Sequence, residues 1–434
     1  MPRSSTTHLR RDDPIKVPAN AFPSYNPPPS QDPFYKPPPG WESKPPGAVL
    51  SIREHAYTAP RKGFPGYFDV LQVLYRTTDS HGRPNYSATV VFMPDSHRKC
   101  AETFRSVSNP ANCSYALVSY NLPYDSSSPD AGVTYTMQFG EPYGEIETML
   151  NRGYFVSVPD YEGSRASYSA NVLAGYTILD QFRALQATLG DYGFKTSGSK
   201  LAMWGYSSGG TATEFAAELA AEYAPDLKLA GAVAGGMTGN MTDSLDLVNM
   251  HDVAGLLVQG IIGLTGEYPE QRKWVDSKLR KDGPSNSSEF YKAGRMFGLD
   301  GLGYYAYQNI YEYFENGRDD VFAPTMLGPM KAEGQAGIHG TPNMPVLIYH
   351  SIYDEMCPIK YLDAMVKGHC EKGGNIWIQR NAIGNHNYEG VNGRQRALDF
   401  LRDVVEGTKT SGRPEKGCRS DDGVWDHNPK VPFS

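Results

Sequence analysis

The sequence lacks the features of several common classes of protein. It contains no apolar run of about 18 residues, so we expect no membrane-spanning helix. Its 41 lysine and arginine residues stand against 48 aspartate and glutamate residues, a net charge of −7, and no basic cluster is dense enough to follow a nucleic-acid backbone. No Cys-x-x-Cys spacing is present, which argues against a zinc site. We therefore expect no membrane span, no nucleic-acid partner and no metal.

The first residues, MPRSSTTHLRRDD, also lack the apolar core of a secretory signal. Two other features nevertheless indicate the secretory route. Cysteine is scarce, and the five residues fit one or two disulfides with one thiol left over: Cys100, Cys113, Cys357, Cys370 and Cys418. The Asn-x-Ser/Thr sequons are candidate glycosylation sites, at Asn85, Asn112, Asn240 and Asn286. Because disulfides and glycans occur in secreted proteins, we expect this protein to be secreted.

Proline, in contrast, is abundant near the N-terminus, in the stretch NPPPSQDPFYKPPPGWESKPPG. Proline blocks the hydrogen bonds of helices and sheets, so residues 1–48 are predicted to be an arm that lies extended over the body or is disordered. Strand-like runs follow at 49–55, 67–76 and 87–93. Turn residues separate the second run from the third, which predicts an antiparallel pair.

From residue 116 onward, strand patterns alternate with helix patterns, which predicts a mostly parallel sheet covered by helices on both faces. The alternation stops near residue 236 and resumes near residue 345. The sequence therefore predicts an α/β fold with a first core part at 49–235, a helical cap insertion at 236–343, and a second core part at 344–434. An apolar cap beside such a sheet is a reasonable surface for binding an acyl chain.

The stretch GYSSG at 205–209 matches the pattern Gly-x-Ser-x-Gly. The pattern alone is weak, but here it follows a buried-looking strand directly and begins an alanine-rich helix. This strand–turn–helix setting is the one that a nucleophile elbow requires. The turn would expose the hydroxyl of Ser207 at a helix N-terminus, where negative charge is favoured. The alternative is a flexible Ser-Gly loop.

A serine hydroxyl needs a base, and three histidines follow the strand at 345–350. His369 falls in a predicted helix, and His427 falls in a polar tail. His386 lies in a Gly/Asn loop after the strand at 375–379, where a catalytic base should be. We therefore take His386 as the base, with a purely structural histidine as the alternative.

The orienting acid should lie between the serine and the histidine in the sequence. Asp354 ends the predicted strand VLIYHSIYD at 346–354, whereas Asp363 looks helical. Glu355 is adjacent and stays open as an alternative. Asp354 is placed to hold the imidazole tautomer, although an aspartate at this place is also often a helix cap.

An oxyanion hole needs two donors. One should be the backbone N–H of Ser208, the residue after the nucleophile. The other should come from the loop after the strand at 116–120. No His-Gly-Gly stretch is present in that loop, which instead offers Tyr124, Asp125, Ser126 and Ser127.

Several motifs in this order resemble the fungal secretory lipase family. They include DPFY at 32–35, LYRTTDSHGRPNYSATVVFMP, RGYFVSVPDYEG, the elbow, YHSIYDEMCP, and the NH before NYEG. The similarity extends to about residue 418. It implies an α/β-hydrolase fold with a helical cap, and a carboxylic-ester hydrolase that acts without a cofactor.

The resemblance also implies roles for single residues. Ser207, Asp354 and His386 match the family's catalytic triad. Asp125 matches an unusual oxyanion residue, an aspartate that donates through its protonated carboxyl. This role requires Asp125 to be buried in a poorly solvated site that raises its pKa.

The cysteines are assigned through the same resemblance. Cys370 and Cys418 match one disulfide of the family. A disulfide between Cys100 and Cys113 is a candidate local replacement for another, which leaves Cys357 free.

The sequence departs from the family in three places. Ser208 stands where the type lipase has a glycine, so its side chain narrows the space beside the nucleophile. Ala131 replaces a cysteine, so the disulfide to the cap should be absent. The chain ends 16 residues after Cys418, where the type lipase continues into a flap, so we expect a more open site.

We therefore expect a monomeric serine hydrolase that acts on small-molecule or lipid esters and contacts lipid interfaces peripherally. Ser207 would attack the ester carbonyl, His386 would shuttle the proton, Asp354 would orient His386, and Asp125 with the Ser208 N–H would stabilise the oxyanion. An acyltransferase or lactone-forming enzyme with the same triad is the main alternative. A prolyl-type peptidase is a second, although no blade-length repeat is present. A non-catalytic binding protein on the same scaffold is the third.

Overall fold

The computed structural model describes residues 15–17, 26–54, 56, 66–106, 113–139 and 143–426. The first part of the predicted arm, Asn112 and His427 lie outside these residues. The described strands are β1 (Ile15–Val17), β2 (Val49–Arg53), β3 (Tyr67–Thr78), β4 (Pro84–Pro94), β5 (Cys113–Asn121), β6 (Phe155–Pro159), β7 (Phe194–Tyr206), β8 (Leu229–Gly235), β9 (Val346–Ser351), β10 (Ile376–Asn381) and β11 (Arg419–Gly423).

The α-helices in the same residues are α1 (Arg98–Ser106), α2 (Val133–Thr136), α3 (Gly144–Asn151), α4 (Asn171–Asp191), α5 (Ser208–Tyr223), α6 (Met241–Val248), α7 (Gly255–Glu267), α8 (Pro269–Lys278), α9 (Ser287–Phe290), α10 (Gly298–Tyr305), α11 (Arg318–Val321), α12 (Pro324–Gly334), α13 (Ile359–Glu371), α14 (His386–Asn392) and α15 (Arg394–Glu406). Short 3-10 turns, among them η5 (Pro129–Ala131), connect some of them.

The strands form one sheet in the order β1-β2-β3-β4-β6-β5-β7-β8-β9-β10-β11. The pairings β2–β3, β3–β4 and β4–β6 are antiparallel, and the others are parallel. The antiparallel pair predicted near the N-terminus is therefore present as β3 and β4. The mostly parallel sheet with helices is the α/β-hydrolase architecture expected from the sequence.

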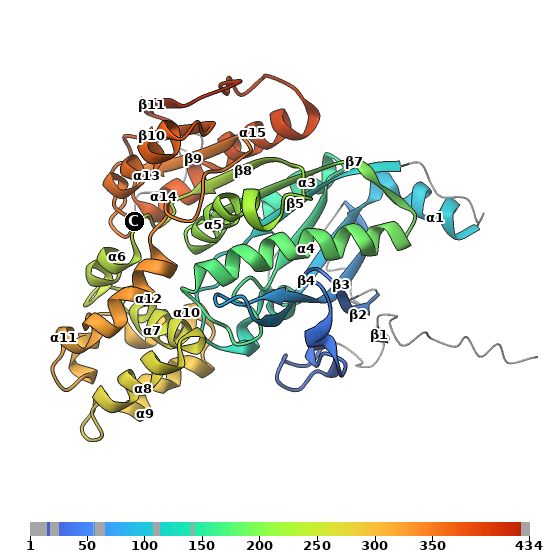
Figure 1. Ribbon diagram of the computed structural model, residues 1–434. Coiled ribbons are helices and arrows are strands. Elements are labelled where there is room, and N and C mark those ends of the chain that lie inside the picture. Colours follow the sequence, from blue (N-terminus) through green and yellow to red (C-terminus); the bar gives the residue numbers. More distant parts are fainter. Residues whose placement is uncertain are drawn as a thin grey trace, which may run out of the picture.

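Helices cover both faces of the sheet (Figure 1). One face packs against α4, α5 and α13, and the other against α3 and α15. Strands β6 and β9 are buried along their whole length, because each is an interior strand of the sheet with a helix layer on either side. This burial explains why these segments are continuous apolar runs in the sequence rather than alternating patterns.

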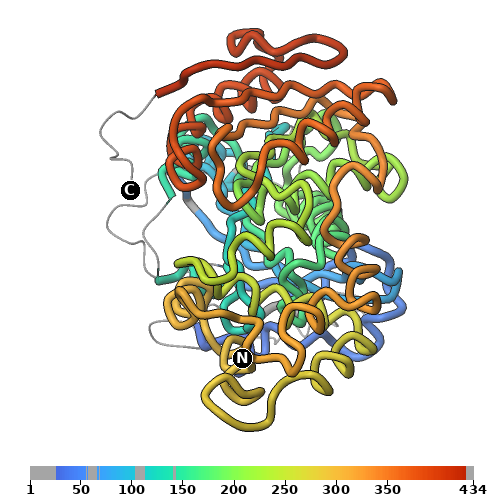
Figure 2. Tube along the Cα trace, turned by 90° about the vertical axis from the view of Figure 1, so that its left-hand side faces the viewer, coloured from blue at the N-terminus to red at the C-terminus, as the bar shows by residue number. Residues whose placement is uncertain are grey.

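Between β8 and β9 the chain leaves the sheet and forms α6 to α12, which pack together around an apolar cluster of their own. Figure 1 shows these helices grouped at one end of the sheet, and Figure 2 shows them at the bottom of the molecule, with the last strands and helices at the top. We call this group the cap. Its predicted limits, 236–343, and the limits of the two core parts stay predictions.

The described part of the proline-rich arm packs on the body of the protein. Phe34 is fully buried. Asp32 accepts two hydrogen bonds from the guanidinium of Arg53 on β2, at 2.7 and 2.8 Å, and both side chains are buried. The arm is fixed to the edge of the sheet by this ion pair.

Both candidate disulfides are present, Cys100–Cys113 and Cys370–Cys418, and Cys357 is a buried free thiol. In the part of the chain that the structure describes, none of the helices combines the length and the apolar character that crossing a membrane requires.

One candidate glycosylation site must be corrected. Asn85 lies on β4 with 3% of its surface exposed, and its Nδ2 atom is buried without a hydrogen-bond partner. A glycan on this nitrogen is incompatible with the packing around it. Asn240 and Asn286 are half-buried N-caps of α6 and α9, and they stay candidate sites.

Candidate active site

The turn between β7 and α5 holds Ser207 in a strained conformation. Ser207 has φ 56° and ψ −126°, and its backbone N–H donates to Gly235 O at 2.9 Å. A Cβ at Gly205 would lie 2.0 Å from Gly209 O, and one at Gly209 would lie 1.9 Å from Asn121 O. Both glycines are therefore required, because no side chain fits where strand, turn and helix approach so closely. The local sequence thus dictates a sharp turn with the serine at its tip.

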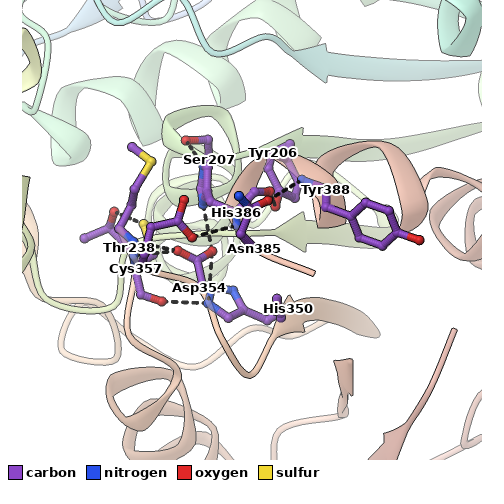
Figure 3. A network of polar contacts seen from close by, with 12 residues as sticks. Tyr206, Ser207, Thr238, His350, Asp354, Cys357, Asn385, His386 and Tyr388 are labelled. Carbon is purple, nitrogen blue, oxygen red and sulfur yellow. Dashed lines mark hydrogen bonds and ion pairs between the residues drawn. The ribbon is translucent and has the colours of Figure 1, made fainter. Parts of the chain in front are cut away.

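Ser207, His386 and Asp354 lie in one chain of hydrogen bonds (Figure 3). His386 Nε2 lies 3.0 Å from Ser207 Oγ, and His386 Nδ1 lies 2.7 Å from Asp354 Oδ2. Asp354 and His386 are 6% and 4% exposed, so the ion pair is shielded from water. The three residues follow the carboxyl ends of three parallel strands, β7, β9 and β10.

Asp354 lies three residues beyond β9, in a tight turn. Its Oδ1 accepts hydrogen bonds from the backbone N–H groups of Met356 and Cys357, at 3.0 and 2.7 Å. The helix that follows, α13, has Pro358 as its N-cap, so Asp354 is not that helix's cap, which corrects one alternative considered above. The turn instead leaves Oδ2 free to face His386.

His386 is not in an irregular loop as expected, but is the first residue of α14. Asn385 caps this helix, accepting a hydrogen bond from Tyr388 N. Glu355, the open alternative for the acid, accepts from the backbone N–H of His386 at 3.0 Å and does not contact the ring nitrogen that Asp354 holds. Asp354, and not Glu355, is therefore the acid that contacts the imidazole ring of His386.

The other candidates lie elsewhere. Asp363 forms an ion pair with Arg380 at 2.9 Å. His369 is fully buried on α13 and lies 3.0 Å from Glu214 of α5. His427 lies outside the described residues.

Charge and burial shift the pKa values of His386 and Asp354 in opposite directions. Burial alone would lower the pKa of His386, but the charge and hydrogen bond of Asp354 outweigh it and raise that pKa well above 6.5. Burial would likewise raise the pKa of Asp354, but His386 holds it below its ordinary value. Beneath them, burial lowers the pKa of His350, whose Nε2 lies 3.5 Å from Asp354 and 2.7 Å from Cys357 O.

Asp125 faces the nucleophile from the loop after β5. It has φ 45°, a left-handed conformation that non-glycine residues rarely adopt, and its Oδ1 atom is buried without a hydrogen-bond partner. Burial raises the pKa of this carboxyl, and Ser208 opposes the shift. Ser208 begins α5, so its N–H has no partner within the helix. The Ser208 hydroxyl lies 3.2 Å from the hydroxyl of Tyr161.

The loop that carries Asp125 is held by the cap. Gln259 of α7 accepts hydrogen bonds from the backbone N–H and the hydroxyl of Ser127, at 2.8 and 2.5 Å. Ser126 donates to Met296 O at 2.9 Å. The cap therefore fixes the backbone on the C-terminal side of Asp125.

Sequence reasoning missed two groups beside the nucleophile. Tyr206, the second residue of the elbow motif, donates to His386 O at 2.6 Å and so positions the histidine. Cys357 lies close to both Asp354 and His386, with its Sγ 3.2 Å from Thr238 Oγ1. An aromatic residue before the nucleophile is a weak pattern, and the place of Cys357 follows only from the fold.

Two clusters among the described residues bring ligand atoms of metal-binding type within 4.8 Å of one another: Asp354, Cys357 and His386, and Glu214, Glu218 and His369. In both clusters the histidine is hydrogen-bonded to a carboxylate, which accounts for the proximity of the groups without an ion.

The fold, the strained serine and the hydrogen-bonded histidine and aspartate are those of an α/β-hydrolase. A sequence model described as secretory lipase matches residues 131–412. The chain is 36% identical over 399 residues to a trichothecene C-3 esterase of Fusarium sporotrichioides, covering 90% of this chain and 87% of that protein. It is 32% identical to lipase A of Arthroderma benhamiae, over 91% of this chain and 82% of that one.

A solved structure, that of Candida antarctica lipase A, superposes with a TM-score of 0.76 at 24% identity, covering 92% of this chain and 91% of that one. The chain belongs to the secretory lipase family. It is accordingly a carboxylic-ester hydrolase.

Proposed function

We propose that this enzyme hydrolyses esters through a Ser207–His386–Asp354 triad and an acyl-enzyme intermediate. The observation that carries the proposal is the unbroken chain of hydrogen bonds from Ser207 Oγ through the imidazole to Asp354. A serine hydroxyl becomes a nucleophile when a base stands within hydrogen-bond reach and a third group orients that base. Both contacts are present here, at 3.0 and 2.7 Å.

In the first half of the reaction, Ser207 Oγ attacks the carbonyl carbon while His386 Nε2 takes its proton. Asp354 keeps the other ring proton on Nδ1 and stabilises the imidazolium that forms. His386 then gives the proton to the alcohol oxygen, the alcohol leaves, and the acyl group stays on Ser207. In the second half, His386 removes a proton from water, which attacks the acyl-enzyme and releases the acid.

The negative oxygen of each tetrahedral intermediate would be stabilised by two donors, the Ser208 N–H and a protonated Asp125. Two observations support this role for Asp125. Its Oδ1 has no partner in the protein, and burial shifts its carboxyl toward the neutral form. A neutral carboxyl can donate a hydrogen bond, which a carboxylate cannot do. One oxyanion donor is typically worth roughly 10²- to 10³-fold in kcat.

We also propose that the protein is secreted, which its two disulfides and its family support.

The test is a Ser207→Ala variant assayed against 4-nitrophenyl esters. The expected loss is roughly 10⁵- to 10⁶-fold in kcat, because the nucleophile is removed. Ser277→Ala, an exposed serine on α8 in the cap, is the matched control and should keep full activity. Ester turnover that persists in a purified, folded Ser207→Ala protein would show that the nucleophile is assigned wrongly.

A further inference from the structure

The cavity at the nucleophile is small. Ser207, Ser208 and Asp125 line a cavity of about 60 Å³ beneath the cap. One ordered water needs roughly 10–15 Å³ by this measure, so the cavity holds on the order of five non-hydrogen atoms. A pocket for a drug-sized ligand is typically about 300–1,000 Å³. The acyl group that is attached to Ser207 in the acyl-enzyme must fit this space.

Side chains of two cap helices set this limit. Met241, Leu245 and Val248 of α6 and Leu256 of α7 form the apolar wall opposite the nucleophile, and each is at most 8% exposed. Close-packed interiors do not yield easily, so these side chains act as a floor rather than a flexible surface.

A polar residue in the wall of this cavity also indicates that the acyl group is short. Ser244 Oγ lines the cavity and is buried without a hydrogen-bond partner. A long alkyl chain laid against this hydroxyl would leave it without a hydrogen-bond partner, which disfavours a long acyl group. A short acyl group leaves room for a water at this position.

A second, larger cavity begins on the other side of Asp125. Its volume is about 460 Å³, and apart from Asp125 no charged side chain lines it. Phe139, Tyr143, Phe297 and Leu299 form part of its wall and are 44%, 42%, 44% and 85% exposed, so this cavity opens to solvent. The alcohol leaves before the acyl-enzyme is hydrolysed, and it needs such an open path.

We propose that the enzyme is specific for short acyl groups, of about two to four carbons, carried on bulky apolar alcohols. The small cavity beneath α6 and α7 takes the acyl group. The large cavity between α2 and α10 takes the alcohol. This inference rests on the proposed function of Ser207, and it makes the enzyme a deacylase of small esters rather than an enzyme for long-chain fats.

The acyl half is tested with 4-nitrophenyl acetate, butanoate and octanoate, assayed below the concentrations at which they aggregate. For the unaltered enzyme, kcat/KM should fall roughly 100-fold or more from acetate to octanoate. Leu245→Ala and the milder Val248→Ala should raise the ratio of kcat/KM for octanoate to kcat/KM for acetate by roughly tenfold.

The matched control is Leu247→Ala, on the same helix but 44% exposed and outside the cavity wall, which should not change the profile. If octanoate equals or exceeds acetate in the unaltered enzyme while Ser207→Ala is inactive, the size limit is wrong and the proposed function stands. If the folded enzyme turns over no ester at all, the proposed function itself fails.

The alcohol half is tested with menthyl acetate against isopropyl acetate, two esters of secondary alcohols that differ in bulk. We expect menthyl acetate to be preferred by roughly tenfold or more in kcat/KM. Phe297→Ser and Leu299→Ser should reduce the ratio of kcat/KM for menthyl acetate to kcat/KM for isopropyl acetate, whereas Leu327→Ser, which is 41% exposed elsewhere on the cap, should not. Equal rates for the two acetates would overturn the assignment of the large cavity.

Discussion

Among the residues that the structure describes, two buried clusters pair a histidine with acidic groups, and they differ in what lies at the other ring nitrogen. His386 has Asp354 on one nitrogen and Ser207 on the other, 3.0 Å away at the edge of a cavity. His369 has Glu214 at 3.0 Å and Glu218 at 3.7 Å from Nε2, while its Nδ1 is buried without a partner.

Both histidines have raised pKa values, so titration behaviour does not separate them. The groups around each histidine distinguish the two. Glu218 of α5 accepts hydrogen bonds from the backbone N–H groups of Gly337 and His339, at 2.5 and 2.9 Å. These two bonds join α5 to the segment that follows α12. A perturbed pKa marks a catalytic group only where a reacting atom is within reach, and a structural ion pair produces the same shift.

The largest contrast should appear in catalysis when each histidine is replaced. His386→Gln should lower kcat roughly 10⁴-fold or more, because Ser207 loses its base. His369→Gln should leave kcat within roughly threefold, because no reacting atom is near it. The measurement is the rate with 4-nitrophenyl acetate on variants whose folding has been checked by circular dichroism. A large loss of kcat in a folded His369→Gln protein would refute the distinction.

The acids should differ in the same way. Asp354→Asn should lower kcat roughly 10³- to 10⁴-fold, since an amide there favours the wrong tautomer of His386. Glu214→Gln should preserve kcat but lower the free energy of unfolding by about 3 kcal/mol, because one partner of a buried ion pair is removed. Urea denaturation of both variants provides the comparison. The distinction between the two acids would be contradicted if Asp354→Asn kept its activity and lost as much stability as Glu214→Gln.

Alkaline pH should test the structural cluster through His369. Burial would lower the pKa of His369, but Glu214 and Glu218 raise it to about 9. Because the folded pKa lies above the unfolded value of about 6.5, the stabilisation is fully present below pH 6.5 and is lost as the pH rises through 9. The loss should be on the order of 3 kcal/mol. His369→Gln should remove this dependence, as measured by urea denaturation from pH 6 to 10.

Acid pH should test the catalytic cluster. Asp354 raises the pKa of His386, and only the neutral imidazole can accept a proton. Activity should therefore be lost as the pH falls through that raised pKa. In Asp354→Asn the remaining activity should persist to lower pH, because the charge that favours the imidazolium is gone. If activity falls at the same acid pH in Asp354→Asn and in the unaltered enzyme, a group other than His386 controls that fall.

The sequence predicted the catalytic cluster better than the structural one, and the reason is distance along the chain. The elbow at Ser207 is a local motif whose glycines are forced by close contacts, so five residues, together with the strand before them and the helix after them, indicated it. Glu214 and Glu218 occur four residues apart on an alanine-rich helix, a spacing equally common on exposed faces. Only the packing of α5 against α13 shows that both face inward.

Other features were out of reach for a similar reason. The sequence placed His386 in a loop, because the short helix α14 depends on a cap by Asn385 rather than on apolar periodicity. It placed Asp125 near the nucleophile but could not show that Oδ1 is buried without a partner. The sequon at Asn85 was indistinguishable from the others until β4 was seen to bury it.

The ion pair between Asp32 and Arg53 sets a limit on proteolytic trimming. Removal of residues up to about position 26 leaves the pair intact. Cleavage beyond Asp32 leaves a guanidinium at 1% exposure with its counter-charge gone, which costs about 3–5 kcal/mol in comparable cases. For the secreted enzyme that we propose, Asp32 thus marks the position in the arm beyond which cleavage removes the counter-charge of a buried guanidinium.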